Sequence, residues 1–282
     1  MKIDIICPLY NAENYLINLD KSLKKQKNVE LNKILYILTE SSDNSEKILK
    51  EMKVDYDLIK KNEFSHSLVR ERKAFQSDAD IIVFITQDII IERDDWLFYL
   101  TKDIESGLAD ACFSRQICKN ESIEKYTRES NYPNKSRIVS KEDIPQLGLN
   151  TFFFSDASSA IKREVFVNLN GYDGKDLVIS EDMYIAYKLI VNGYKIKYCA
   201  DSEVIHSHEF TLKQYYNRYK DTGKFFKENN YLNNYKVNKA GGNLAKYVLK
   251  RAIQDKNYKV LLKYIPNMAV RFIGMQVGKR TK

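Results

Sequence analysis

The chain has 282 residues, 44% of them hydrophobic and 12% aromatic, and a net charge of +8. This length and apolar content exclude a disordered chain and predict one large domain, or a domain with an appendage. Apolar runs stay well below the roughly 18 residues of a membrane span, and residues 1–8 resemble a strand and not a signal peptide. Four cysteines without metal-type spacing predict a reducing cytosol.

The positive charge is concentrated at the C-terminal end. From Tyr235 onward, 12 Lys and Arg face the single acid Asp255, a local balance of +11, which leaves −3 for residues 1–234. This asymmetry predicts an anionic partner for the tail alone. Because residues 1–234 carry no recognised nucleic-acid motif, nucleic acid is not the expected partner.

Strand and helix signals alternate over the first hundred residues, as is typical of βαβ units and a parallel sheet. Apolar β-branched runs predict strands, and apolar residues at helical spacing predict helices. The predicted strands are residues 3–7, 33–38, 57–61 and 81–86. The predicted helices are residues 11–27, 41–52 and 66–76.

Elements are less regular after residue 96. The sequence predicts helices at 96–106, 181–192 and 212–227, and strands at 109–116, 151–154 and 195–199. Residues 117–150 are polar and read as a long loop or lid. Ser180 is the expected N-cap of the helix that follows it. Gly241 and Gly242 separate the body from a helical region at 244–276 that Pro266 is expected to break, so the predicted units are 1–233 and 234–282.

The apolar run at residues 81–86 ends close to a carboxylate, Asp88. In open α/β sheets the ligand crevice lies outside the carboxyl ends of the strands. A carboxylate there can hold Mg²⁺ or Mn²⁺, which neutralises charge on a departing diphosphate. The alternative is that Asp88 only begins a turn.

Two further segments could contact a nucleotide. Pro8 and Tyr10 follow the first strand, where backbone amides can receive a base or phosphate and Tyr10 could face a pyrimidine, although this is also ordinary turn chemistry. Arg70 lies one helical turn after His66 and could reach a phosphate with two hydrogen bonds.

Three polar groups fall in the second half. Asp182 begins a helix, where a carboxylate is stabilised as the anion and can accept a proton from a hydroxyl, although acids also favour this position for dipole reasons alone. His206 and His208 alternate on an extended segment, so one of them is expected to enter the site as a metal ligand. Gln214 and Arg218 share a helix face that could bind diphosphate or acceptor, or be a polar surface.

Taken in order, these pieces resemble family 2 glycosyltransferases of the GT-A fold, and particularly rhamnosyltransferases of bacterial polysaccharides. The resemblance covers about residues 1–230. It is carried by Cys-Pro-Leu-Tyr-Asn at 7–11, Phe-Ser-His at 64–66 with Arg70, Phe-Ile-Thr-Gln-Asp at 84–88, Ser-Ala-Ile-Lys-Arg at 159–163 with Gly-Tyr-Asp at 171–173, Ser-Glu-Asp at 180–182 and Val-Ile-His at 204–206.

The resemblance implies a Rossmann-like mixed sheet flanked by helices, with the basic helical tail as an extension. It implies a nucleotide pocket at Pro8 and Tyr10, a metal bound by Asp88 and His206, and Asp182 as the general base of an inverting transfer. Gln87, within the Thr-Gln-Asp form, is expected beside the donor dTDP-L-rhamnose. Glu181, next to the base, is expected on the acceptor or diphosphate side.

Two departures from the family pattern leave the donor open. Leu38 takes the place of the usual acid that grips the nucleoside, so Glu40 or Asp43 is expected to substitute. The usual Gln and Arg followed by Trp is altered to Gln214, Arg218 and Tyr219. The alternatives are a UDP-hexose donor in the same fold, and a non-catalytic scaffold that binds nucleotide sugars.

The family's acceptors, growing glycans on a lipid diphosphate carrier, imply a peripheral protein at the cytoplasmic face of the cell membrane. The tail interleaves apolar and basic residues, as an amphipathic helix on anionic lipid requires. The alternatives are packing of the tail on its own catalytic domain, or on a second copy in a homodimer.

Overall fold

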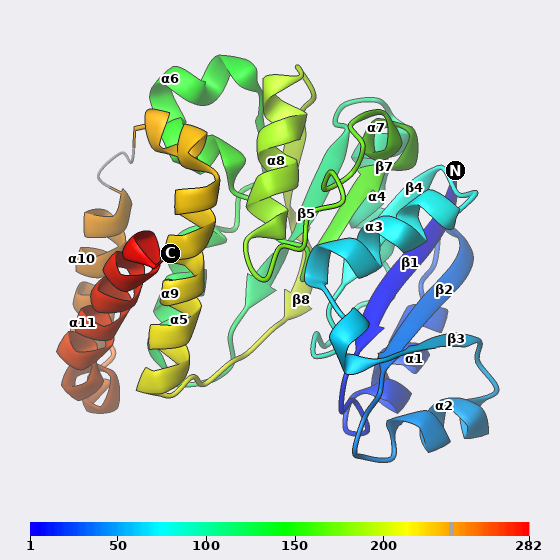
Figure 1. Cartoon of the computed structure of the whole chain (residues 1–282), viewed down its shortest axis with the longest axis horizontal. Coiled ribbons are helices and arrows are strands. Elements are labelled where there is room, and N and C mark those ends of the chain that lie inside the picture. Colours follow the sequence, from blue (N-terminus) through cyan, green and yellow to red (C-terminus); the bar gives the residue numbers. More distant parts are fainter. Residues whose placement is uncertain (237–239, 282) are drawn as a thin grey trace.

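The computed structural model describes residues 1–236 and 240–281. Its centre is a mixed sheet of eight strands in the order β3-β2-β1-β4-β7-β5-β8-β6 (Figure 1). The strands are β1 (Lys2–Leu9), β2 (Glu30–Thr39), β3 (Tyr56–Ile59), β4 (Ile81–Ile85), β5 (Ala111–Ile117), β6 (Arg137–Val139), β7 (Ser158–Lys162) and β8 (Ile196–Ile205). The mixed sheet flanked by helices that the sequence predicted is confirmed.

Strands β3, β2, β1 and β4 are parallel, as the alternating pattern predicted. Strand β7 then pairs antiparallel with both β4 and β5, while β5 and β8 are again parallel. The strand predicted at 151–154 is wrong: these residues enter a 3₁₀ turn, Gly148–Phe152, and the strand follows it as β7. Phe152 and Phe154 are nonetheless buried, which explains why the apolar run looked like a strand.

Two layers of helices cover the sheet, and each has its own apolar cluster. One layer is formed by α1 (Leu16–Lys24), α2 (Ser45–Met52) and α4 (Trp96–Glu105), which pack over residues such as Ile5 and Val83. The other is formed by α3 (His66–Gln76), α7 (Arg163–Asn168) and α8 (Glu181–Val191), which pack over residues such as Ile82 and Phe84. Alternate residues of one strand therefore enter opposite clusters.

The expectation of a loop at 117–150 is wrong. The segment contains α5 (Ile123–Asn131), strand β6 and α6 (Ile144–Leu147). Ile123 and Tyr126 of α5 pack against Val248 and Ala252 near the C-terminal end of the chain. The apolar side of α5 is short, and it is buried only because a distant helix covers it.

The C-terminal part consists of α9 (Leu212–Glu228), α10 (Ala240–Gln254) and α11 (Tyr258–Arg280). Gly241 and Gly242 lie within the bounds of α10, and Pro266 lies inside α11, so the predicted break at Pro266 is wrong. The break falls at 255–257, where Lys256 has a φ of 53° and the Asn257 side chain accepts a hydrogen bond from the Val260 amide.

Helix α11 packs closely along α9, so the tail contacts the body (Figure 1). Gly223, Gly274 and Gly278 line the contact, and a Cβ at Gly278 would overlap the Lys220 carbonyl. Among the described residues, none of the helices is long and apolar enough to cross a bilayer. All four cysteines are free and buried, in agreement with the absence of a disulfide framework in the sequence.

Candidate active site

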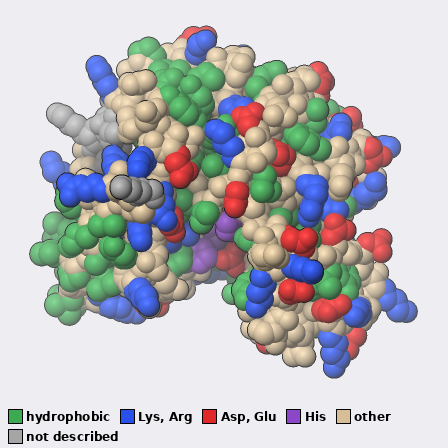
Figure 2. Space-filling model, viewed as in Figure 1, with side chains coloured by type: hydrophobic (Ala, Val, Ile, Leu, Met, Phe, Trp, Pro, Cys, Tyr) green, Lys and Arg blue, Asp and Glu red, His purple; other side chains and the backbone are tan. Residues whose placement is uncertain are grey.

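A cavity of about 880 Å³ lies beyond the carboxyl ends of β1 and β4. Its walls come from both halves of the sheet and from helices α3, α5, α8, α9 and α11. Figure 2 shows a hollow in the middle of this face with histidine and acidic side chains at its base. The volume is within the usual range for sites that enclose small molecules.

Asp88, His206 and His208 meet at the base of the cavity, with ligand atoms within 4.8 Å of one another. Each histidine Nε2 lies 3.5 Å from an oxygen of Asp88, and the two Nε2 atoms are 2.7 Å apart. The expectation that one histidine would point away is therefore wrong. Strand β8 ends at Ile205, so strand alternation no longer applies, and His208 turns inward and stacks on Phe210 at 5.0 Å.

Gln116 sets the tautomer of His206. The Arg128 guanidinium, which can only donate, hydrogen bonds to Gln116 Oε1, while Gln116 Nε2 donates to Ser155 at 2.7 Å. The 2.8 Å contact between His206 Nδ1 and Gln116 Oε1 therefore requires the proton on Nδ1. The Nε2 lone pair of His206 consequently faces Asp88.

The protonation of this cluster at neutral pH suits a metal site. Burial lowers the pKa of His206, and it lowers the pKa of His208 to about 4 with help from His206. One carboxylate and two neutral imidazoles are then available as donors, a set that fits a divalent ion such as Mn²⁺.

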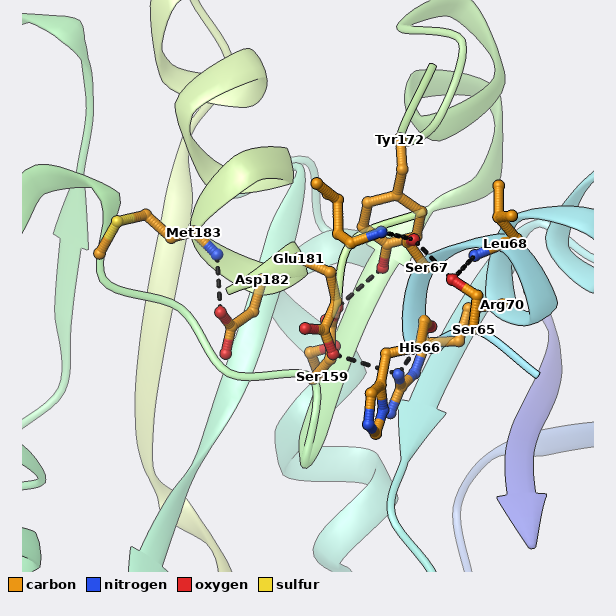
Figure 3. Close-up of polar contacts among 12 residues, drawn as sticks. Ser65, His66, Ser67, Leu68, Arg70, Ser159, Tyr172, Glu181, Asp182 and Met183 are labelled. Atoms are coloured by element: carbon orange, nitrogen blue, oxygen red, sulfur yellow. Dashed lines mark hydrogen bonds and ion pairs between the residues drawn. The ribbon is translucent and has the colours of Figure 1, made fainter. Parts of the chain in front are cut away.

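Two acids at the start of α8 have different partners (Figure 3). Glu181 accepts a hydrogen bond from Arg70 at 3.2 Å, whereas Asp182 accepts one from the Met183 amide at 2.7 Å. Burial raises the pKa of Asp182, and the charges of Glu181 and Asp156 raise it further. Asp182 lines the cavity as an acid with unusually high proton affinity, which is a property of general bases.

Arg70 and Ser180 shape the cavity wall around these two acids. Arg70 lines the cavity and is only 2% exposed, and its Nη1 donates to Glu181 and to the His66 carbonyl, so it holds Glu181 while its expected contact with a phosphate stays a prediction. Ser180 is the N-cap residue of α8, as expected, but its φ of 64° is left-handed and its side chain makes no capping hydrogen bond. It turns the chain so that Glu181 and Asp182 enter the cavity wall.

The loop after β1 is held by Gln87. Gln87 Oε1 accepts a hydrogen bond from the Tyr10 amide at 2.7 Å, and its Nε2 donates to the Tyr10 carbonyl at 2.9 Å. Pro8, Tyr10 and Gln87 all line the cavity, next to Asp88. The half-exposed Tyr10 ring, with the Lys61 ammonium 5.5 Å from its centroid, is available to a flat ligand.

Glu40, Asp43 and Gln214 lie away from the cavity lining. Asp43 accepts hydrogen bonds from the Glu13 amide and from Ser45, which fixes the loop before α2. Gln214 Oε1 accepts a hydrogen bond from the Thr211 amide at 2.8 Å and so caps α9, while its expected contact with the acceptor stays a prediction. Arg218 does line the cavity, with its guanidinium 5.0 Å from the Phe210 ring centroid.

Sequence reasoning missed several residues of the cavity wall. Asp156 is buried and accepts hydrogen bonds from Tyr172 at 2.8 Å and Ser159 at 2.7 Å. Its signal in the sequence was a lone acid two residues after the apolar run 152–154. Arg128 and Arg271 also line the cavity, but they lie on α5 and α11, whose positions depend on tertiary contacts.

Two known proteins are similar to this chain over most of its length. The chain is 34% identical over 229 residues to the O-antigen chain rhamnosyltransferase RfbN of Salmonella typhimurium, covering 80% of this chain and 72% of the relative. It is 33% identical to the O-antigen chain rhamnosyltransferase WbaN of Salmonella anatum, covering 78% and 71%.

Solved structures share the fold at low sequence identity. The mannosyltransferase PcManGT of Pyrobaculum calidifontis, in complex with GDP-Man and Mn²⁺, superposes with a TM-score of 0.62 at 13% identity, covering 99% of this chain and 86% of that one. TarS 1-349 of S. aureus gives a TM-score of 0.58 at 15% identity, covering 90% and 72%. Residues 4–169 match the family described as Glycosyl transferase family 2, and the chain belongs to that family of glycosyltransferases.

Proposed function

We propose that this chain is an inverting, divalent-metal-dependent rhamnosyltransferase. Its donor is dTDP-L-rhamnose, and its acceptor is a hydroxyl of a growing cell-wall or capsular polysaccharide on a lipid carrier. The observation that carries the proposal is the meeting of Asp88, two histidines and Asp182 on one cavity. The two relatives with about one third identity, both named O-antigen chain rhamnosyltransferases, support the sugar and the kind of acceptor.

In this mechanism the donor binds across the carboxyl ends of β1 and β4. The backbone around Tyr10, held by Gln87, receives the nucleotide, and Asp88 with His206 and His208 holds the ion. A divalent cation, when bound there, supplies positive charge that stabilises the departing diphosphate. Arg218, which lies over Phe210 in the same cavity, is positioned to neutralise a second anionic group of donor or acceptor.

Asp182 removes the proton from the acceptor hydroxyl as that oxygen attacks the anomeric carbon. The carbon–oxygen bond forms on the face opposite the departing dTDP, so the configuration inverts and no second nucleophile is required. Arg70 donates a hydrogen bond to Glu181 beside Asp182, and the negative charge of Glu181 raises the pKa of Asp182. A lipid-linked acceptor would keep the reaction at the cytoplasmic membrane face.

The direct test is consumption of a panel of nucleotide sugars, with Mn²⁺ or Mg²⁺, by the parent, Asp88→Asn and Asp182→Asn. We expect dTDP-L-rhamnose to be consumed and both variants to lose at least about a hundredfold in turnover while remaining folded. Consumption of a UDP-hexose would refute the sugar assignment but keep the enzyme class. Binding of dTDP without turnover of any donor would favour a non-catalytic scaffold.

The metal assignment is tested by calorimetric titration with Mn²⁺ alone. We expect His208→Ala to weaken Mn²⁺ binding by about tenfold or more, because it removes one of three protein ligands. His66→Ala is the matched control, since His66 lines the same cavity outside the cluster. Equal Mn²⁺ affinity of the parent and His208→Ala would remove His208 from the metal site.

A further inference from the structure

Helix α11 is apolar on two opposite faces. One face packs on α9 and α10 and buries Val260, Asn267, Gly274 and Gly278. The opposite face, at spacings of three and four residues, is exposed: Leu262 is 81%, Ile265 76% and Phe272 66% accessible. The exposed apolar residues of this stripe are Tyr258, Leu262, Ile265, Phe272 and Ile273. An exposed apolar stripe of this length commonly marks a surface that binds a partner or a membrane.

Helix α10 continues this exposed surface and adds charge. Leu249 and Ile253 are exposed one helical turn apart, and Lys246 and Lys250 are exposed between and beside them on the same face. Lys256, Lys259 and Lys263 are exposed at the connection to α11 and on its first turns, where Lys259 pairs with Glu209 at 3.0 Å. Figure 2 shows hydrophobic side chains with Lys and Arg among them over α10 and α11.

We propose that the exposed faces of α10 and α11, here called the hairpin surface, dock on an anionic lipid bilayer. The apolar side chains enter the boundary between headgroups and acyl chains, and the lysines contact the phosphates. Charge complementarity favours anionic lipid as the partner of the hairpin surface, because the apolar stripe is flanked by lysines and Asp255 is the only acid after residue 234. A second copy of the chain would bring these lysines against one another, which opposes self-association.

Arg271 relates the hairpin surface to the cavity. It is buried on the opposite side of α11, where it lies 4.3 Å from the Tyr215 ring centroid and donates to Glu124 at 3.2 Å. Arg271, Tyr215 and Glu124 all line the cavity. One helix therefore presents its outer face to lipid and its inner face to the site, so docking would hold the cavity wall against the membrane.

The test is co-flotation of the full chain with vesicles of phosphatidylethanolamine and phosphatidylglycerol, and with vesicles of phosphatidylcholine alone. We expect the parent to bind the anionic vesicles and to bind the neutral ones weakly. Leu262→Glu with Ile265→Glu should lower the partition coefficient by about a hundredfold, since two inserted apolar groups become charges. Lys246→Glu with Lys250→Glu should lower it by about tenfold or more.

A matched control carries the same chemical change elsewhere on the surface. Leu58 and Leu108 are 52% and 47% exposed outside the hairpin surface, and Leu58→Glu with Leu108→Glu should leave flotation unchanged. Equal flotation of the parent and the Leu262/Ile265 variant would overturn the proposal. Failure of the parent chain to bind the anionic vesicles would also overturn it. So would sedimentation that shows the parent as a dimer and the Leu262/Ile265 variant as a monomer, because that result would assign the hairpin surface to a second copy.

The docking proposal is independent of the donor and the chemistry. Vesicle binding is measured without any nucleotide sugar, so failure of the rhamnosyltransferase assignment leaves the flotation result standing. Conversely, loss of flotation in the Leu262/Ile265 variant with unchanged hydrolysis of the donor in vesicle-free buffer would support docking and leave the site intact.

Discussion

Asp182 and Glu181 are neighbours in sequence, but their surroundings give them different chemistry. The Arg70 guanidinium holds Glu181, whereas burial and two nearby acids raise the pKa of Asp182. A sequence motif can identify both acids but cannot assign the roles, because the partner of Glu181 is 111 residues away along the chain. The same limit explains His208, whose inward turn depends on Phe210 and not on strand periodicity.

The pH dependence of turnover follows from this pair. If Asp182 is the base, as we propose, it must be unprotonated to react, so kcat/KM should fall as pH falls through the raised pKa of Asp182. Glu181→Gln removes a negative charge that raises this pKa, so it should move the acid limb of the profile to lower pH by about one unit. The measurement is log kcat/KM against pH.

A control for this profile is Asp173→Asn, which replaces another acid by its amide. The Asp173 carboxylate pairs with Lys188 and accepts a hydrogen bond from Tyr184, and the residue lies outside the cavity lining. Its acid limb should match that of the parent. If the acid limb of Glu181→Gln falls at the same pH as that of the parent, a group other than Asp182 determines it.

Helices and strands whose own sequence pattern is strong were predicted. Those that depend on packing against a segment far along the chain were missed. Strand β4 is a continuous apolar run, β1 is mostly apolar, and α3 carries its own N-cap, Ser65, so the sequence indicates them directly. Helix α5 required α10 to cover it. Pro266 was expected to break α11, but the packing of α11 along α9 maintains the helix through it.

Close packing of α11 on α9 depends on glycine. Gly278→Ala should lower the free energy of unfolding by about 1–3 kcal/mol, because its Cβ would overlap the Lys220 carbonyl, a backbone atom that cannot move aside cheaply. Urea denaturation measures the loss. Gly242→Ala, on α10 with open space around its Cβ, is the matched control and should cause no loss. Equal stability of the two variants would show that α9 and α11 can separate at little cost.

At the scale of the whole molecule, two parallel units are joined by one antiparallel strand, β7. The first unit, β3-β2-β1-β4, follows the alternating sequence pattern and was predicted. The second, β5 with β8, is separated in sequence by α5, β6, α6, β7, α7 and α8, so its pairing could not be obtained from local periodicity. Residues from both units line the cavity, so the part of its wall that comes from the second unit was only partly predicted.

The packing of the whole chain predicts the behaviour of its thiols. Cys7, Cys112, Cys118 and Cys199 are all free and buried, and burial raises the pKa of Cys7 and Cys112. The native chain should react slowly with a thiol reagent, and all four cysteines should react after denaturation in guanidinium. Rapid labelling of Cys118 in the native state would contradict this, and would indicate that the region around α5 opens readily.

The placement of Arg271 on the inner side of α11 has a consequence for the size of the acceptor. If the outer side rests on lipid, the thickness of one helix, about 10 Å, separates the bilayer from the cavity wall. An acceptor hydroxyl would then have to extend at least this far from the bilayer to pass the part of the cavity wall that Arg271 forms. The helix would then act as a spacer that selects acceptors by their height above the membrane.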